Sequence, residues 1–177
     1  VGIANHCPPV EQIIALLAEA HALGQDVARV HSGDPSLYGA IGEQIRELRA
    51  LNIPFEIVPG VTATAACAAL LEAELTLPEV AQTVILTRYG HNSPMPAGEE
   101  LGALASHRAT LAIHLGVQHL PRIIDELLPY YGADCPIAVV HRASWPDQDW
   151  VRGTLADIEA RVAVKGFRRT CLLYTSD

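Results

Sequence analysis

The chain has 177 residues, half of them hydrophobic and 18% charged, so it is long and apolar enough to bury a core. Its net charge of −8 and pI near 5.4 argue against a nucleic-acid-binding surface, which needs clustered Lys and Arg. No apolar run approaches the roughly 18–20 residues that span a bilayer. The cysteines are widely spaced, without a metal-ligand or redox pattern (Cys7, Cys67, Cys135 and Cys171). We therefore expect a cytoplasmic globular protein with no membrane association, no nucleic-acid partner and no metal site.

Helical and strand-like patterns alternate along the first part of the chain. Apolar residues at helical spacing predict a helix over 9–23, and a β-branched run predicts a strand over 27–31. Turn-forming residues at 32–35 end that strand, and a second helical stripe runs from Leu37 to Leu48. A strand is predicted over 55–58, ending at Pro59 and Gly60, and an Ala-rich helix over 62–71.

The second part repeats this alternation after a linker-like segment at Pro78. Strands are predicted over 83–87, 110–115, 136–141 and 170–174, and helices over 101–105, 120–128 and 154–162. Residues 89–98 and 144–153 read as loops. Strands that alternate with helices predict α/β layers with a mostly parallel sheet. We expect two domains, a truncated N-terminal α/β domain over 1–78 and a C-terminal α/β domain over 79–177.

The loops that leave the predicted strands are the natural place for a ligand, because open α/β sheets bind ligands beyond the carboxyl ends of their strands. Gly33 and Gly60 would let a ligand approach the main chain, and Asp34 could accept hydrogen bonds from an amine or a ribose hydroxyl. Alternatively, Asp34 is a turn residue at the start of the next helix, and spacing alone favours this reading. No phosphate-binding or nucleophile motif is present. The pattern thus predicts a ligand crevice without specifying a reaction.

Two runs carry a family resemblance. Residues 29–40 (RVHSGDPSLYGA) and 56–63 (EIVPGVTA) resemble the second and third signatures of the tetrapyrrole methylases. Two others, at 73–88 and at 142–155, resemble within that family the precorrin-4 or cobalt-precorrin-4 carbon-11 methyltransferases rather than the uroporphyrinogen or precorrin-2 enzymes. The similarity extends from about Val10 to about Tyr174.

The resemblance has one large departure. The family normally begins with a strand and a G-x-G-P-G-D loop, and this segment is absent; the last strand also looks short, and both ends look cut. The resemblance therefore implies a class III methyltransferase-like α/β fold, with two α/β domains, a cleft between them and an N-terminally truncated first domain. Without the opening strand, a sheet edge would be left open.

The resemblance implies methyl transfer from S-adenosylmethionine to carbon 11 of precorrin-4 or cobalt-precorrin-4 in cobalamin biosynthesis, by a protein that is usually a homodimer. The donor is already activated by its sulfonium charge, so no catalytic residue is assigned and the protein mainly positions and desolvates. The implied cofactor residues fall into three groups: Ser32, Gly33, Asp34 and Leu37 at the methionine and ribose end, Thr62 and Ala63 along the methionine, and Leu115 and Ala143 beside the adenine.

The implied tetrapyrrole substrate carries carboxylates, which cations near the crevice would receive. Arg88, His91 and Arg142 are the candidates, since each falls in a loop that leaves a strand; alternatively they are solvated loop residues. Tyr89 and Trp145 would stack on the macrocycle or anchor their loops. His31 and His114 read as core or crevice-wall residues rather than metal ligands.

Two other functions stay open. Members of the same superfamily include RNA ribose methyltransferases and diphthine synthases, although the runs at 83–88 and 142–147 argue against both. The chain could also be an inactive fragment that does not bind the cofactor. The sequence does not distinguish a cobalt-containing substrate from a metal-free one.

Overall fold

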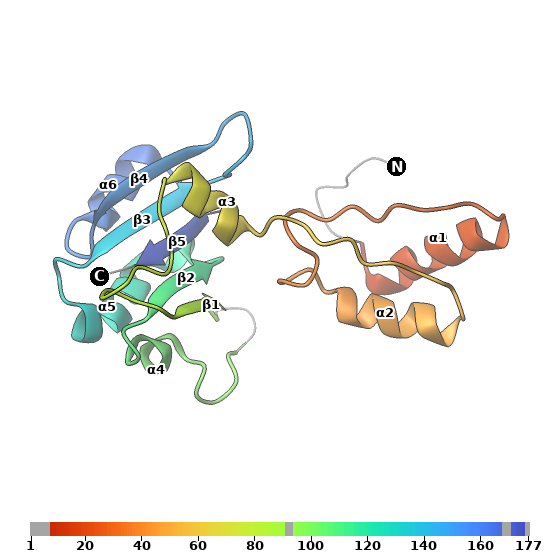
Figure 1. The fold of residues 1–177 in the computed structure, drawn as a ribbon, viewed down its shortest axis with the longest axis horizontal. Coiled ribbons are helices and arrows are strands. Elements are labelled where there is room, and N and C mark those ends of the chain that lie inside the picture. Colours follow the sequence, from red (N-terminus) through yellow and green to blue (C-terminus); the bar gives the residue numbers. More distant parts are fainter. Residues whose placement is uncertain (1–7, 91–93, 168–170, 176–177) are drawn as a thin grey trace. The chain divides into compact units, whose positions relative to one another are not determined.

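The computed structural model of the chain describes residues 8–90, 94–167 and 171–175. They form two compact units, Val1–Thr62 and Ala63–Asp177, each described here by itself (Figure 1). The division differs from the predicted boundary at Pro78. The reason is that helix α3 (Ala63–Leu70) packs on the sheet of the second unit, where Cys67 and Leu71 share a buried apolar cluster with residues of β2 and β3.

The first unit contains helices α1 (Val10–Ala22) and α2 (Ile41–Ala50), which pack against each other. Both helices were predicted, but α2 begins later than the apolar stripe suggests. Tyr38 and Ala40 have φ values of 57° and 51°, in the left-handed region, which a right-handed helix cannot contain. The stretch after Leu37 is therefore a turn that delivers the chain into α2.

The predicted strands at 27–31 and 55–58 are not formed, and this part of the prediction was wrong. Both stretches lack helical and ladder hydrogen bonding, and no described segment pairs with them. Their apolar side chains stay in solvent: Val30 is 78% exposed and Val58 is 71% exposed. A β-branched run favours strand geometry, but a strand also needs a hydrogen-bonded neighbour.

The second unit is built on a five-stranded sheet with the order β1-β2-β5-β3-β4. Its strands are β1 (Val84–Arg88), β2 (Thr110–His114), β3 (Pro136–His141), β4 (Asp149–Thr154) and β5 (Cys171–Thr175). Only β1 and β2 pair in parallel, while β5 lies antiparallel between β2 and β3, and β3 pairs antiparallel with β4. The expectation of a mostly parallel sheet was wrong for this unit.

Strand β4 was also missed, because its residues were read as the polar loop 144–153. It is an edge strand with no fully buried residue, so it lacks the apolar run that marked β1, β2 and β3. It forms a strand because it pairs with β3 in a hairpin, although its polar composition does not indicate a strand. The following helix, α6 (Ile158–Lys165), starts later than the predicted 154.

The sheet is covered on both faces, and successive side chains of β2 point into the two cores alternately. Leu111 and Ile113 point into the larger core with α4 (Leu101–Ala105), α5 (Leu120–Tyr131) and α6, whereas Ala112 points to the α3 side. A short 3-10 turn, η1 (Val117–His119), leads into α5. Small residues on the α3 side let this helix lie close to the sheet (Figure 1).

Candidate functional site

Two loops of the first unit that carry predicted site residues lie against each other. We call residues 32–40 and 59–62 the paired loops. A side chain added at Gly60 would overlap the main-chain oxygen of Gly33, so the two glycines are in direct main-chain contact. Gly33 also has a φ of 71°, which favours glycine. The contact requires the absence of a Cβ at Gly60 and fixes the spacing of the two loops.

Asp34 ties the paired loops together. Its Oδ2 accepts a hydrogen bond from the main-chain N–H of Gly60 at 2.9 Å, and its Oδ1 accepts one from the N–H of Ser36 at 2.8 Å and another from the Ser36 hydroxyl. The Ser36 hydroxyl first, and then the main-chain N–H groups, hold the pKa of this carboxyl below its ordinary value. Both carboxylate oxygens are thus engaged by protein donors. The turn reading of Asp34 holds in this structure, and any contact with a ligand would be additional to it.

The other predicted residues of the paired loops surround this tie. Ser32 and Gly33 are exposed, and Leu37 is half-buried with its N–H donating to the Asp34 carbonyl at 3.2 Å. Thr62 is the last residue of the first unit, and Ala63 begins α3 in the second.

Helix α3 is fixed to the end of β2 by a contact that sequence analysis did not predict. The Thr64 hydroxyl lies 3.1 Å from Nε2 of His114, and Thr64 is buried. Burial lowers the pKa of His114 below its usual 6.5, so the neutral imidazole is favoured. His114 is therefore held at the end of β2 by its contact with Thr64. No spacing pattern marks Thr64, which looks like any small residue of an Ala-rich helix.

Strands β1, β2 and β3 end at the same edge of the sheet. β1 is parallel to β2, and both β2 and β3 are antiparallel to β5, so all three point the same way. β2 and β3 each end in histidine, and the next residues, Leu115 and Arg142, have φ values of 58° and 49°. A left-handed backbone at such residues costs on the order of 1–3 kcal/mol and is found preferentially at functional sites. This strain was not visible in the sequence.

The two residues implied to flank an adenine follow β2 and β3, which end at this edge with β5 between them. Leu115 follows β2 and is 68% exposed. Ala143 follows β3 by two positions and is half-buried against the apolar cluster beneath α3. One residue thus offers an exposed apolar side chain, and the other a packed and small one. Their roles toward a ligand remain predictions.

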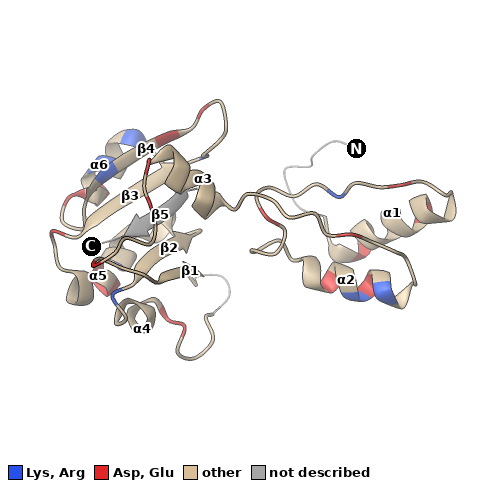
Figure 2. Cartoon of the chain, viewed as in Figure 1, with Lys and Arg blue, Asp and Glu red and all other residues tan. Residues whose placement is uncertain are grey.

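The candidate cations differ in their surroundings. Arg88 ends β1, opposite His114 in the register, and its Nη2 donates to the Pro94 carbonyl at 3.5 Å. Arg142 forms an ion pair with Asp147, with 2.6 Å between Nη1 and Oδ2. His91 lies outside the described residues. Helices α2 and α6 each carry two further basic residues, Arg46 and Arg49 on α2 and Arg161 and Lys165 on α6 (Figure 2).

The two aromatic candidates, Tyr89 and Trp145, also differ in their surroundings. The Tyr89 hydroxyl donates to Oε1 of Glu126 at 3.2 Å, and its ring lies 5.3 Å from that of His119. Burial and the nearby Glu126 raise the pKa of Tyr89. Tyr89 is therefore a loop anchor. Trp145 is instead 50% exposed, with the Arg142 guanidinium 4.2 Å from its ring centroid.

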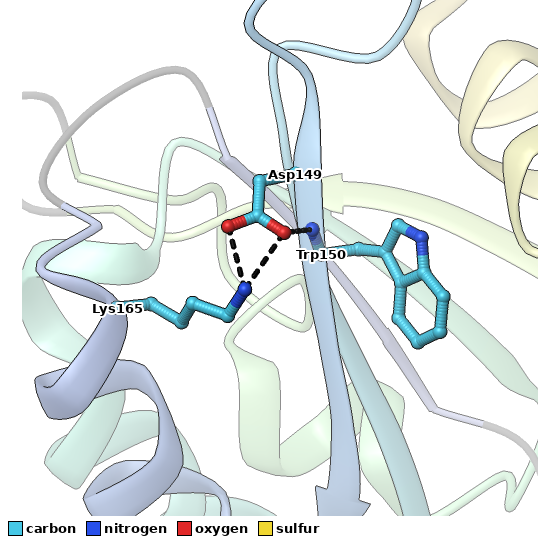
Figure 3. A network of polar contacts seen from close by, with 3 residues as sticks. All are labelled: Asp149, Trp150 and Lys165. Atoms are coloured by element: carbon cyan, nitrogen blue, oxygen red, sulfur yellow. Dashed lines mark hydrogen bonds and ion pairs between the residues drawn. The ribbon is translucent and has the colours of Figure 1, made fainter.

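The hairpin that carries Arg142 and Trp145 stands on a fixed base. Asp149 accepts hydrogen bonds from the Lys165 ammonium at 2.7 and 2.9 Å and from the Trp150 N–H at 2.8 Å (Figure 3). The Lys165 hydrogen bond is the main reason that the pKa of Asp149 lies below its ordinary value. This contact ties the first residue of β4 to α6, immediately after the loop that carries Arg142 and Trp145.

Within 8–90, 94–167 and 171–175, no group of three or more His, Cys, Asp or Glu side chains is placed to hold a metal ion. In the same part of the chain, no helix has both the length and the hydropathy needed to cross a membrane.

Comparison with known proteins gives the same family as the sequence motifs. A family model described as Tetrapyrrole (Corrin/Porphyrin) Methylases matches residues 5–159. A precorrin-4 C(11)-methyltransferase of Pseudomonas aeruginosa is 72% identical over 95% of this chain and 67% of its own length. A cobalt-precorrin-4 C(11)-methyltransferase of Methanocaldococcus jannaschii is 47% identical over 95% of the chain, which spans 65% of that relative.

Solved structures give the same grouping. The X-ray structure of a cobalt-precorrin-4 methyltransferase of cobalamin biosynthesis superposes with a TM-score of 0.93 at 37% identity, covering 98% of this chain and 73% of that one. A uroporphyrin-III C-methyltransferase of Thermus thermophilus complexed with S-adenosyl homocysteine gives a TM-score of 0.72 at 28% identity, over 93% of this chain and 72% of that chain. The fold expected from the motifs is therefore confirmed.

Proposed function

The chain belongs to the tetrapyrrole (corrin/porphyrin) methylases, and from this premise we propose that it transfers a methyl group from S-adenosylmethionine to carbon 11 of precorrin-4 or cobalt-precorrin-4. The observation that carries the choice of reaction is the 72% identity to a precorrin-4 C(11)-methyltransferase over nearly all of this chain. Relatives named for the cobalt-containing and the metal-free substrate are both similar, so either form fits the proposal.

The paired loops suit a cofactor that is recognised by main-chain contacts. Gly33 and Gly60 lie against each other without side chains, and Ser32 next to them is exposed. Close main-chain approach is what glycine permits, and loops with fixed spacing reduce the entropy cost of ordering them around a ligand. S-adenosylmethionine, when bound, supplies an activated methyl group on a sulfonium.

The chain's own residues then have to bind, orient and exclude water. Ser32, Gly33, Asp34 and Leu37 would contact the methionine and ribose, with Thr62 and Ala63 along the methionine. Leu115 and Ala143 would contact the adenine. No dedicated base is required of the protein for the transfer itself, because orientation and desolvation contribute most to such a displacement.

The substrate would be received by cations at the carboxyl ends of the strands. Arg88 ends β1 and Arg142 follows β3, at the same edge of the sheet. Guanidinium groups bind carboxylates in a bidentate manner, and the substrate carries several of them. A homodimer and a cytoplasmic location remain predictions of the resemblance.

A direct test uses S-adenosylmethionine with an isotopically labelled methyl group and precorrin-4 as acceptor. We expect the label at carbon 11 of the product, read by NMR. A label at another carbon, or transfer to ribosomal RNA in a parallel reaction, would exclude the proposed acceptor. Calorimetric titration with S-adenosylhomocysteine separates an inactive chain from a wrong acceptor, because an inactive fragment would give no binding heat at high micromolar ligand.

A further inference from the structure

The loop between β3 and β4, residues 142–148, holds its own shape; we call it the hairpin loop. The N–H of Trp145 donates to the Arg142 carbonyl and the N–H of Gln148 to the Trp145 carbonyl, both at 3.0 Å. The N–H of Ser144 donates to the Gln148 side chain at 2.8 Å. These bonds lie within the loop, so its form does not depend on a ligand.

The base of the hairpin loop is fixed as well. His141 and Asp149 are opposite each other in the β3–β4 register, and Asp149 is paired with Lys165 of α6 (Figure 3). The His141 ring stacks on Phe167 with 5.2 Å between centroids. A loop that is closed internally and held at both ends presents its side chains in a defined arrangement.

Within this arrangement, Arg142 is held from two sides. Its Nη1 lies 2.6 Å from Oδ2 of Asp147, and its guanidinium carbon lies 4.2 Å from the Trp145 ring centroid. The Arg142 side chain is 32% exposed and that of Asp147 is 55% exposed. The ion pair and the half-exposed indole therefore lie at the surface, next to the end of β3.

Asp147 offers Arg142 a single nitrogen–oxygen contact, whereas a guanidinium can bind a carboxylate through two parallel hydrogen bonds. An exposed ion pair of this kind contributes little to stability. A carboxylate arriving on a ligand can therefore replace Asp147 at small cost. The stacked Trp145 keeps the guanidinium in place during the exchange.

We propose that Asp147 is a positioning residue that holds Arg142 on Trp145 and yields it to a carboxylate of the macrocyclic substrate. This rests on the carboxylate-bearing substrate proposed above. Asp147 thus acts as an internal competitor: it keeps the cation in position in the absence of substrate and weakens the binding of anionic ligands. A substrate that lacks a carboxylate at this place would not displace it, so the exchange also contributes to specificity.

The test uses the chain with Trp150→Phe, which leaves Trp145 as its only tryptophan. The probe is a porphyrin with eight carboxylates, whose binding is followed by quenching of Trp145 fluorescence. Asp147→Asn keeps the size and an acceptor oxygen but removes the competing charge. We expect a dissociation constant about fivefold lower, the order expected for an exposed pair. Glu159→Gln, an exposed acid on α6, is the charge-matched control and should leave the constant unchanged.

The effect must depend on Arg142. In an Arg142→Gln background the probe should bind more weakly, and Asp147→Asn should add no further change. With precorrin-4 as acceptor, Asp147→Asn should lower KM by a larger factor than it changes kcat. An unchanged constant in Asp147→Asn, or an equal gain in both backgrounds, overturns the inference.

These outcomes are separable from those of the proposed function, because the fluorescence titration needs no turnover. Coupling between Asp147 and Arg142 without methyl transfer to precorrin-4 would contradict the proposed reaction alone. Methyl transfer without this coupling would contradict the exchange alone.

Discussion

The paired loops of the first unit and the hairpin loop of the second are both held by an aspartate, but in different ways. Asp34 binds the main chain of another segment, through the N–H of Gly60, and the contact of Gly33 with Gly60 leaves no space for a side chain. Asp147 binds a side chain of its own loop, Arg142, in an exposed ion pair. The first arrangement fixes the main chain of one loop to that of the other, and the second holds a charged side chain at the surface.

The difference indicates what each loop can do. A spacing set by main-chain contacts is suited to a ligand that must be held in one position, such as a methyl donor. An exposed ion pair is suited to an anionic ligand that binds and dissociates, because replacing one carboxylate by another changes the free energy of the protein only slightly. Variants of the two loops should therefore differ in size of effect and in whether binding or folding is affected.

The largest effect is expected from Gly60→Ala, which would break the contact between the paired loops. The new methyl group would overlap the Gly33 oxygen, and backbone has to move to relieve it. Overpacking of this kind costs about 1–3 kcal/mol. Calorimetry with S-adenosylhomocysteine should show a loss of affinity of about five- to 150-fold, which corresponds to that cost. Gly42→Ala in α2, where a Cβ meets no atom, is the matched control and should keep full affinity.

Asp34→Asn should have the next largest effect, because one of the two carboxylate oxygens becomes an amide that cannot accept. We expect affinity for S-adenosylhomocysteine to fall about three- to tenfold, the size of one lost charge-assisted hydrogen bond at an exposed position. Asp26→Asn, an exposed acid in the same unit, is the control. Equal affinity of both variants would show that the tie does not support the site.

The pH dependence of the tie follows from the lowered pKa of Asp34. A carboxyl whose pKa is lower in the folded state contributes stability that is fully present above its ordinary 3.8 and is lost as the pH falls through the folded value. The affinity difference between the Asp34→Asn variant and the original chain should therefore persist down to about pH 4, the ordinary carboxyl range. A difference that disappears already near pH 6 would contradict the role of the charge.

A third effect concerns His114, which is buried next to Thr64 at the end of β2. Burial lowers its pKa below 6.5, so the unfolded chain binds a proton more readily than the folded one. The resulting stability is present above pH 6.5 and is lost as the pH falls below it. His114→Asn should flatten the fall of urea-unfolding stability below pH 6.5. The same change at exposed His107 should leave the slope as it was.

The smallest effect is expected from Lys165→Gln, which removes the ion pair below the hairpin loop. Both side chains are more than 40% exposed, so the loss should be under about 1 kcal/mol in urea unfolding. The loss should shrink further in high salt. A much larger value would mean that the base of the hairpin loop carries more of the unit's stability than its exposure indicates.

Periodicity predicted most of the helices and the strands β1, β2, β3 and β5, since each of these has an apolar pattern of its own. It failed at 27–31 and 55–58, where the pattern is that of a strand but no described segment pairs with it. It failed also at β4, which has no apolar strand pattern and forms a strand through its hydrogen bonds to β3. A strand forms only where a neighbouring strand pairs with it, so the sequence of one segment alone does not determine whether it becomes a strand.

The sequence by itself determined the alternation of elements, the family, and the loops in which Gly33, Gly60 and Asp34 lie. Local patterning and short motifs are properties of contiguous residues, so they can be read directly. Only the tertiary structure decided that Asp34 binds the N–H of Gly60, that Thr64 contacts His114, and that Leu115 and Arg142 carry left-handed backbone. These features depend on atoms brought together from distant positions or on dihedral angles set by the surrounding fold, which no spacing along the chain encodes.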